Sequence, residues 1–128
     1  MKLNHLYLLV RDLERSRSFY ERYLGFNGPS EWQMETFVIR NADGFSFALT
    51  PDPEPPVWPK SLHFGFLLGD DVETVRRLHA RLVADDVPIV ESMFQPAFGV
   101  FKFLDPQGSP CFPPRASFTV ALLRPMAN

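Results

Sequence analysis

The sequence predicts an α+β fold built from two βαβββ units, and three observations lead to this prediction. The segment His5–Asp12 has a second copy at His63–Asp70, and each copy is a short apolar run that starts with His and ends with Asp. A stretch with helical spacing follows each copy. A turn-forming sequence precedes an apolar run late in each half, at 41–44 and at 105–108. Such an internal repeat in a short chain is typical of a duplicated supersecondary unit.

The composition is that of an ordinary globular protein. The chain has 128 residues, with 45% hydrophobic residues, 22% charged residues and a net charge of -2. The weak charge and the absence of a basic stripe argue against a nucleic-acid partner. No apolar run reaches the roughly 18 residues that a membrane span needs. The single cysteine excludes a disulfide within the chain, and with no signal peptide in view we expect a cytoplasmic protein.

The first unit is expected over residues 1–50. Residues 3–10 alternate as a strand, with Leu6 and Leu8 on one face and His5 and Tyr7 on the other. A helix is predicted over 13–24, because Asp12 is a suitable N-cap and Gly25 a suitable stop. The period of two then predicts strands at 31–34, 36–40 and 45–50, with a tight turn at 41–44.

The second unit is expected over residues 61–128, after a stiff proline-rich linker at 51–60. A strand at 61–68 precedes a helix whose apolar face runs from Val72 to Val83. Asp70 and Glu73 have the spacing of a capping box, so Asp70 is the expected N-cap. Strands are predicted at 88–94 and 98–104.

The end of the second unit departs from the repeat. Three prolines in 109–114 stand where the last strand is expected, and proline cannot donate a hydrogen bond to a central strand. Two alternatives follow. Residues 116–123 supply the missing strand, displaced along the chain, or they form an edge strand that pairs outside the unit.

Several motifs resemble those of the vicinal oxygen chelate superfamily, which includes glyoxalase I, extradiol dioxygenases, fosfomycin-modifying enzymes and bleomycin-resistance proteins. The resemblance covers about 3–108 and rests on the following segments: Leu3-Asn4-His5, Asp12, Phe19-Tyr20, Tyr23-Leu24-Gly25-Phe26, Ser61-Leu62-His63-Phe64 and the run from Phe101 to Gly108. It implies that the two units form a U-shaped cleft that holds a small molecule, and that the chain forms a homodimer.

The resemblance also implies where a metal would bind. Ligands come from the first and the last strand of each unit, and His5 and His63 match the first-strand positions. The last-strand carboxylate is expected four residues beyond the turn glycine, which is Ala48 in the first unit and Phe112 in the second. Neither side chain binds a metal, and two imidazoles alone make a poor divalent-metal site. We expect no cofactor, although a divalent metal stays an alternative, with Glu31, Glu35 and Glu91 as candidate replacement ligands.

Other residues are candidates for binding the small molecule. Tyr7 shares the face of His5, where it contacts a ligand or packs in the core. Gly65 occupies the equivalent place in the second unit and leaves room for a ligand. Lys102 lies between two phenylalanines and faces the cleft or solvent. Trp32 and Met34 are expected on one strand face, where they line an aromatic surface with Phe37 or pack in a core or dimer interface. The full candidate set is His5, Tyr7, Trp32, Met34, Ala48, His63, Gly65, Lys102 and Phe112.

The leading functional prediction is a metal-independent protein that binds a small aromatic or amphiphilic molecule. The retained histidines combined with two lost carboxylate positions support it. One alternative is a metal-dependent lyase, isomerase, transferase or dioxygenase, in which the metal polarises a substrate oxygen. A second alternative is an interaction module without a ligand, whose cleft is closed by phenylalanine side chains.

Overall fold

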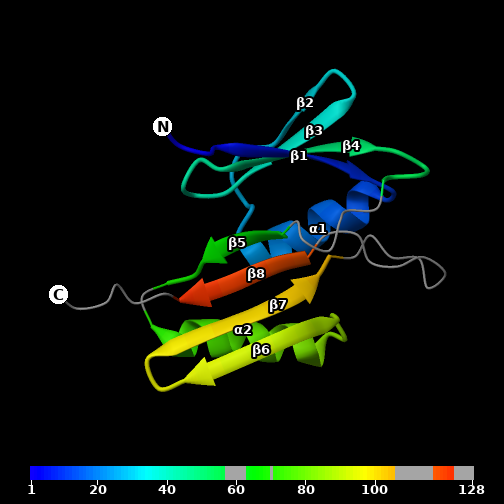
Figure 1. Cartoon of the computed structure of the whole chain (residues 1–128). Helices are drawn as coiled ribbons and strands as arrows, with labels where there is room; N and C mark the ends of the chain where they lie inside the picture. Colours follow the sequence, from blue (N-terminus) through cyan, green and yellow to red (C-terminus); the bar gives the residue numbers. More distant parts are fainter. Residues whose placement is uncertain (57–62, 70, 106–116, 123–128) are drawn as a thin grey trace. The chain divides into compact units, whose positions relative to one another are not determined.

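The computed structural model describes residues 1–56, 63–69, 71–105 and 117–122 (Figure 1). The chain divides into two compact units, Met1–Pro56 and Val57–Asn128. Each unit has one helix and a four-stranded sheet. The prediction of an α+β fold with two βαβββ units is therefore confirmed. Residues 57–60 of the expected linker lie outside the described residues.

The first unit contains β1 (His5–Val10), α1 (Leu13–Leu24), β2 (Glu31–Gln33), β3 (Thr36–Arg40) and β4 (Ser46–Pro51). The strand order in its sheet is β1-β4-β3-β2, so the last strand lies between the first and the third. β4 is parallel to β1 and antiparallel to β3. This arrangement makes β4 the centre of the first unit, in contact with strands from both ends of its sequence.

Local sequence signals set both ends of α1. The Asp12 carboxylate accepts a hydrogen bond from the Arg15 backbone N–H at 3.0 Å, which satisfies one of the unpaired donors of the first turn. Gly25 ends the helix in the left-handed conformation, with φ at 71°. A side chain is disfavoured at this φ, so glycine is the residue that fits.

The core of the first unit lies between α1 and one face of the sheet. Phe47 on β4 is fully buried, and its ring centroid lies 4.6 Å from that of Tyr20 on α1 and 4.6 Å from that of Phe26. The strand residues that alternate onto this face are likewise buried: Leu8, Val10, Phe37, Ile39 and Leu49. The opposite face of the sheet therefore carries His5, Tyr7 and their neighbours.

The second unit contains β5 (His63–Leu67), α2 (Val72–Ala84), β6 (Ile89–Gln95), β7 (Phe98–Leu104) and β8 (Ser117–Leu122). Its strand order, β5-β8-β7-β6, repeats that of the first unit. β8 is parallel to β5 and antiparallel to β7. Residues 117–122 thus supply the displaced last strand, and the alternative of an edge strand that pairs outside the unit is wrong.

The helix of the second unit is capped one residue later than predicted. Asp71, rather than Asp70, is the N-cap, because its extended backbone lets the carboxylate accept the Thr74 backbone N–H at 2.8 Å. Val75, Leu78 and Leu82 of α2 are buried with Phe101 and Phe103 of β7. No helix within the described ranges is long and apolar enough to cross a membrane.

Candidate functional site

The face of the first sheet opposite α1 carries a shallow hollow of about 260 Å³. Strand register explains which side chains meet there. His5 is paired with Ser46, Tyr7 with Ala48, and Ala48 in turn with Val38 across β3 and β4. The hollow is lined by Asn4, His5, Gln33, Val38, Arg40, Ser46 and Ala48. Two of the predicted site residues, His5 and Ala48, therefore lie in one hollow, and Tyr7 is next to it.

The imidazole of His5 is held by its neighbour in the chain. Nδ1 lies 2.7 Å from the side-chain oxygen Oδ1 of Asn4. Because a carboxamide oxygen only accepts hydrogen bonds, Nδ1 is the donor in this contact, which leaves Nε2 for a ligand. His5 is exposed, so Nε2 is accessible to a ligand.

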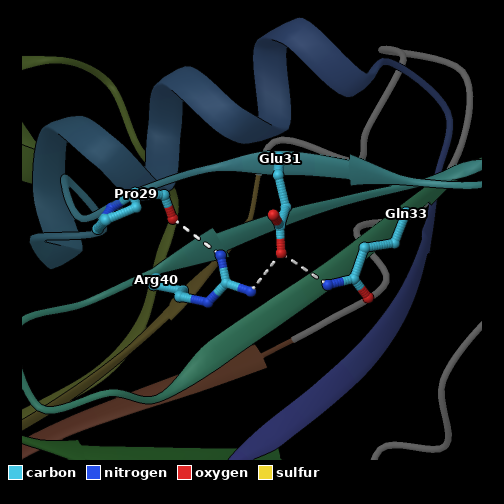
Figure 2. Close-up of polar contacts among 4 residues, drawn as sticks. All are labelled: Pro29, Glu31, Gln33 and Arg40. Carbon is cyan, nitrogen blue, oxygen red and sulfur yellow. Dashed lines mark hydrogen bonds and ion pairs between the residues drawn. The ribbon is translucent and has the colours of Figure 1, made fainter.

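Three polar side chains form a hydrogen-bonded cluster beside the hollow (Figure 2). The Arg40 guanidinium donates through Nη2 to Glu31 Oε1 at 2.9 Å and through Nη1 to the Pro29 carbonyl at 3.1 Å. The same Glu31 oxygen accepts a hydrogen bond from Gln33 Nε2 at 2.8 Å. The Gln33 amide, followed by the Arg40 guanidinium, lowers the pKa of the Glu31 carboxyl from its usual value. Glu31 is therefore held as the carboxylate.

Tyr7 adds an exposed aromatic surface to this face. Its side chain is 56% exposed, and its cross-strand neighbour is the methyl group of Ala48. Further along β3 and β4, the hydroxyls of Thr36 and Thr50 lie 2.7 Å apart in a hydrogen bond. The face therefore changes from charged near Arg40 to apolar and weakly polar near Tyr7.

The second sheet repeats the pairing of an acid on its edge strand with a cation on the next strand. Lys102 Nζ on β7 lies 3.1 Å from Glu91 Oε1 on β6. Phe101 and Phe103 on either side of Lys102 are fully buried, so Lys102 faces away from α2, as the alternation predicts. The two charged residues line a small hollow of about 160 Å³ together with Ser92, Met93, Val100 and Phe101.

The register also identifies the position in β8 that corresponds to Ala48 in β4. Ala48 pairs with Tyr7, and Thr119 pairs with Gly65, the equivalent of Tyr7. The structural equivalent of Ala48 is therefore Thr119 rather than Phe112, because the last strand is displaced along the chain. Phe112 lies outside the described residues. His63 pairs with Ser117 as His5 pairs with Ser46, so the two histidines occupy equivalent register positions.

The β4 residues paired with His5 and Tyr7 add no carboxylate or imidazole to this face. The strand neighbours of His5 on its face supply a hydroxyl and a methyl group, from Ser46 and Ala48. Of the candidate replacement ligands, Glu31 is bound to Arg40 and Glu91 to Lys102. In the part of the chain that the structure describes, no three His, Cys, Asp or Glu side chains are grouped as a metal site would require.

Trp32 and Met34 do not share a strand face, contrary to the prediction. β2 ends at Gln33, and Met34 lies in the turn that follows, with φ at 58° and a 98% exposed side chain. Trp32 pairs with Phe37, their ring centroids are 5.2 Å apart, and Phe37 is buried on the side of α1. Trp32 therefore extends the helix-side aromatic cluster and not the face that carries His5.

Arg40 and Gln33 were not among the predicted site residues. The period of two in the sequence does indicate their strand face. Arg40 lies on the same face of β3 as Val38, and Gln33 lies on the same face of β2 as Glu31. Their convergence depends on the β2–β3 register, which sequence alone does not give. The cluster forms because Glu31 lies opposite Val38, and Arg40 is the next residue after Val38 on the same face of β3.

Comparisons with known proteins bear on the fold and the family of the chain. The sequence profile of the Glyoxalase/Bleomycin resistance protein/Dioxygenase superfamily matches residues 2–110. A search of curated proteins finds no significant match.

Solved structures with the same fold include proteins from three organisms. A possible glyoxalase from Bacillus cereus is 25% identical, with a TM-score of 0.72 over 94% of this chain and 97% of that chain. The fosfomycin resistance protein FosX from Listeria monocytogenes is 16% identical, with a TM-score of 0.73 over 97% and 94% of the two chains. A glyoxalase/dioxygenase from Nostoc punctiforme is 18% identical, with a TM-score of 0.71 over 94% and 90%. With its duplicated units and the profile match over most of its length, the chain belongs to the Glyoxalase/Bleomycin resistance protein/Dioxygenase superfamily.

Proposed function

We propose that this protein binds a small aromatic or amphiphilic molecule without the help of a metal ion, at a site that includes the open face of its first sheet. The superfamily supplies the context, since its name covers both resistance proteins and enzymes. One fold hosts many activities, so the proposal is argued from the side chains of this chain.

The observation that carries the proposal is the set of metal donors around His5. Ala48 places a methyl group where the family has a carboxylate, and Thr119 occupies the equivalent register position in the second unit. The acids nearest to these faces, Glu31 and Glu91, are each paired with a cation. In both units the acid on the edge strand is therefore already paired with a neighbouring cation.

The same face has the features of a binding surface for a ring. Tyr7 is more than half exposed and lies next to Ala48. The tyrosine ring and the alanine methyl group therefore offer a planar ligand an aromatic and an apolar contact. The Nε2 of His5 is left for a hydrogen bond with a ligand. A few convergent polar groups beside an apolar surface are typical of small-molecule sites.

Two measurements on the full-length protein test the proposal. The first is the metal content of the purified protein, before and after incubation with Zn²⁺, Mn²⁺ or Ni²⁺ followed by dialysis. The second is a titration with 2-naphthamide, a neutral aromatic probe, in the presence of EDTA, followed by two-dimensional ¹H–¹⁵N NMR. We expect substoichiometric metal and saturable shifts of the Tyr7 and Ala48 amide signals that EDTA leaves unchanged.

Other outcomes favour the alternative functions. Near-stoichiometric metal that is lost, together with turnover, in His63→Ala or His5→Ala would identify a metal-dependent enzyme and refute the proposal. The retained histidines at equivalent positions are the observation in favour of that alternative. If 2-naphthamide causes no saturable shift with or without metal, the protein is an interaction module and the proposal is wrong. The homodimer and the U-shaped cleft that the resemblance implies stay predictions.

A further inference from the structure

The hollow on the first sheet combines the guanidinium of Arg40, which is paired with Glu31, with aliphatic side chains. Arg40, Gln33 and Ser46 supply hydrogen-bond donors, while Val38 and Ala48 supply aliphatic surface. Ser46 and Arg40 are directly paired across β4 and β3, and both line the hollow. A cation beside aliphatic surface suits a ligand that has a negatively charged group attached to an apolar body.

The guanidinium of Arg40 is already oriented before any ligand arrives. Its Nη1 is held by the Pro29 carbonyl and its Nη2 by the Glu31 carboxylate, and its side chain is only 30% exposed (Figure 2). A guanidinium has five N–H donors in a rigid planar fork. Among the described residues, these two contacts are the hydrogen bonds of the Arg40 side chain, so donors are left for a ligand.

The ion pair with Glu31 does not prevent a ligand anion from binding Arg40. Glu31 is 52% exposed, and exposed ion pairs are weak because water screens them. A ligand carboxylate that enters the hollow competes with Glu31 for the guanidinium or shares it through the remaining N–H groups. Glu31 is therefore a positioning residue for Arg40 and a source of repulsion for the ligand.

We infer that the ligand of this site is an organic anion, an aromatic or aliphatic carboxylate or a similar oxyanion, whose charged group binds Arg40 in the hollow beside His5. This inference rests on the proposed function, because the apolar body of the ligand occupies the face that carries Tyr7 and Ala48. It adds the charge of the ligand and the residue that recognises it.

A matched set of probes separates the two proposals. The probes are 2-naphthoate, its neutral amide 2-naphthamide, and acetate, which has the charge without the ring. Each is titrated into the ¹⁵N-labelled protein, and the Arg40 Nε–H signal and the Ser46 and Ala48 amide signals are followed by NMR. We expect 2-naphthoate to bind about tenfold more tightly than 2-naphthamide, as for the gain of a charge-assisted hydrogen bond.

Substitutions at the cluster test the assignment to Arg40. Arg40→Gln is expected to weaken 2-naphthoate about tenfold and to leave 2-naphthamide unchanged. Arg15→Gln, on the exposed side of α1, removes the same charge from the same unit and is the control. Glu31→Gln keeps an acceptor for Arg40 but removes the competing charge, so 2-naphthoate should bind about two- to fivefold more tightly. This opposite sign keeps the test decisive if Arg40→Gln fails to fold.

Each outcome assigns failure to one of the two proposals. Equal affinity for 2-naphthoate and 2-naphthamide at the Tyr7 and Ala48 signals would refute the anion site and leave the metal-independent binding proposal standing. Equal affinity for acetate and 2-naphthoate, centred on Arg40, would support the anion site and refute the aromatic ligand. A loss of 2-naphthoate binding in Arg15→Gln as large as that in Arg40→Gln would refute the assignment to Arg40.

Discussion

The aromatic cluster around Phe47 gives the sharpest stability prediction. Phe47 is fully buried on the central strand of the first unit, directly between Ser46 and Ala48 of the candidate site. It stacks on Phe26 at 4.6 Å and 17° and meets the Tyr20 ring at 4.6 Å. The change to test is Phe47→Ala, with Phe47→Leu as the variant that keeps an apolar side chain.

The magnitude follows from what each variant removes. Truncation of a buried phenylalanine to alanine costs about 3–5 kcal/mol in the free energy of unfolding, because burial is lost and a cavity remains. The lost burial of the phenyl ring accounts for roughly 1.5–3 kcal/mol of this cost. Each lost contact between two aromatic rings adds about 0.5–1.5 kcal/mol. With two close ring partners, we expect about 4 kcal/mol for Phe47→Ala. Phe47→Leu keeps most of the apolar volume and should cost about 1–2 kcal/mol.

Urea unfolding followed by tryptophan fluorescence measures this loss in the first unit. The chain has two tryptophans, so a Trp58→Phe background leaves Trp32 on β2 as the reporter. Phe45→Ala is the control, because Phe45 is only half-buried and its centroid distances to Phe26 and Phe47 are longer, at 6.4 and 5.7 Å. A cost of Phe47→Ala below about 1 kcal/mol, or no larger than that of Phe45→Ala, would refute the reasoning.

Two further predictions concern the helix ends. Gly25→Ala should lower the free energy of unfolding by about 1 kcal/mol in the same urea assay. The cost comes from its φ of 71°, because no atom beyond the adjacent residues lies within 4 Å of the added Cβ. An unchanged midpoint would contradict this. The Thr74 backbone N–H lowers the pKa of the Asp71 carboxyl, so this cap stabilises the fold above the ordinary aspartate pKa of about 3.9 and loses its effect as pH falls through the lower folded value. The difference in thermal midpoint between wild type and Asp71→Asn should therefore shrink below about pH 4, and a constant difference would contradict it.

Much of the fold follows from patterns that the sequence carries locally. The alternation in 5–10 and 98–104 predicts which side chains are buried, because neighbouring strand residues point to opposite faces. The N-cap at Asp12 and the stop at Gly25 are equally local, since a cap needs only its own backbone angle and the next turn. Both were therefore correctly predicted. Asp70 and Asp71 offer the same carboxylate one residue apart, and local pattern does not choose between them.

The site was harder to predict, because it depends on how strands are paired. Counting four residues from Gly108 leads to Phe112, whereas the pairing of β8 with β5 leads to Thr119. Likewise, the alternation in 31–34 puts Trp32 and Met34 on one face only if the strand continues, and it ends at Gln33. Arg40 and Glu31 meet through the β2–β3 register alone. Residues with reactive or polar side chains could be recognised by type in the sequence, but the residues that lie next to them in the fold could not.

The position of β4 and β8 has a consequence for how the protein forms during synthesis. In each unit the middle of the sheet is filled by the strand that leaves the ribosome last, after both strands that flank it. The nascent first unit can complete its sheet as soon as Pro51 has emerged. In the second unit, the edges of β5 and β7 that pair with β8 stay unpaired until β8 has been synthesised. Because Ser117 pairs with His63 across a longer stretch of chain than Ser46 with His5, closing the sheet of the second unit has the larger loop-entropy cost.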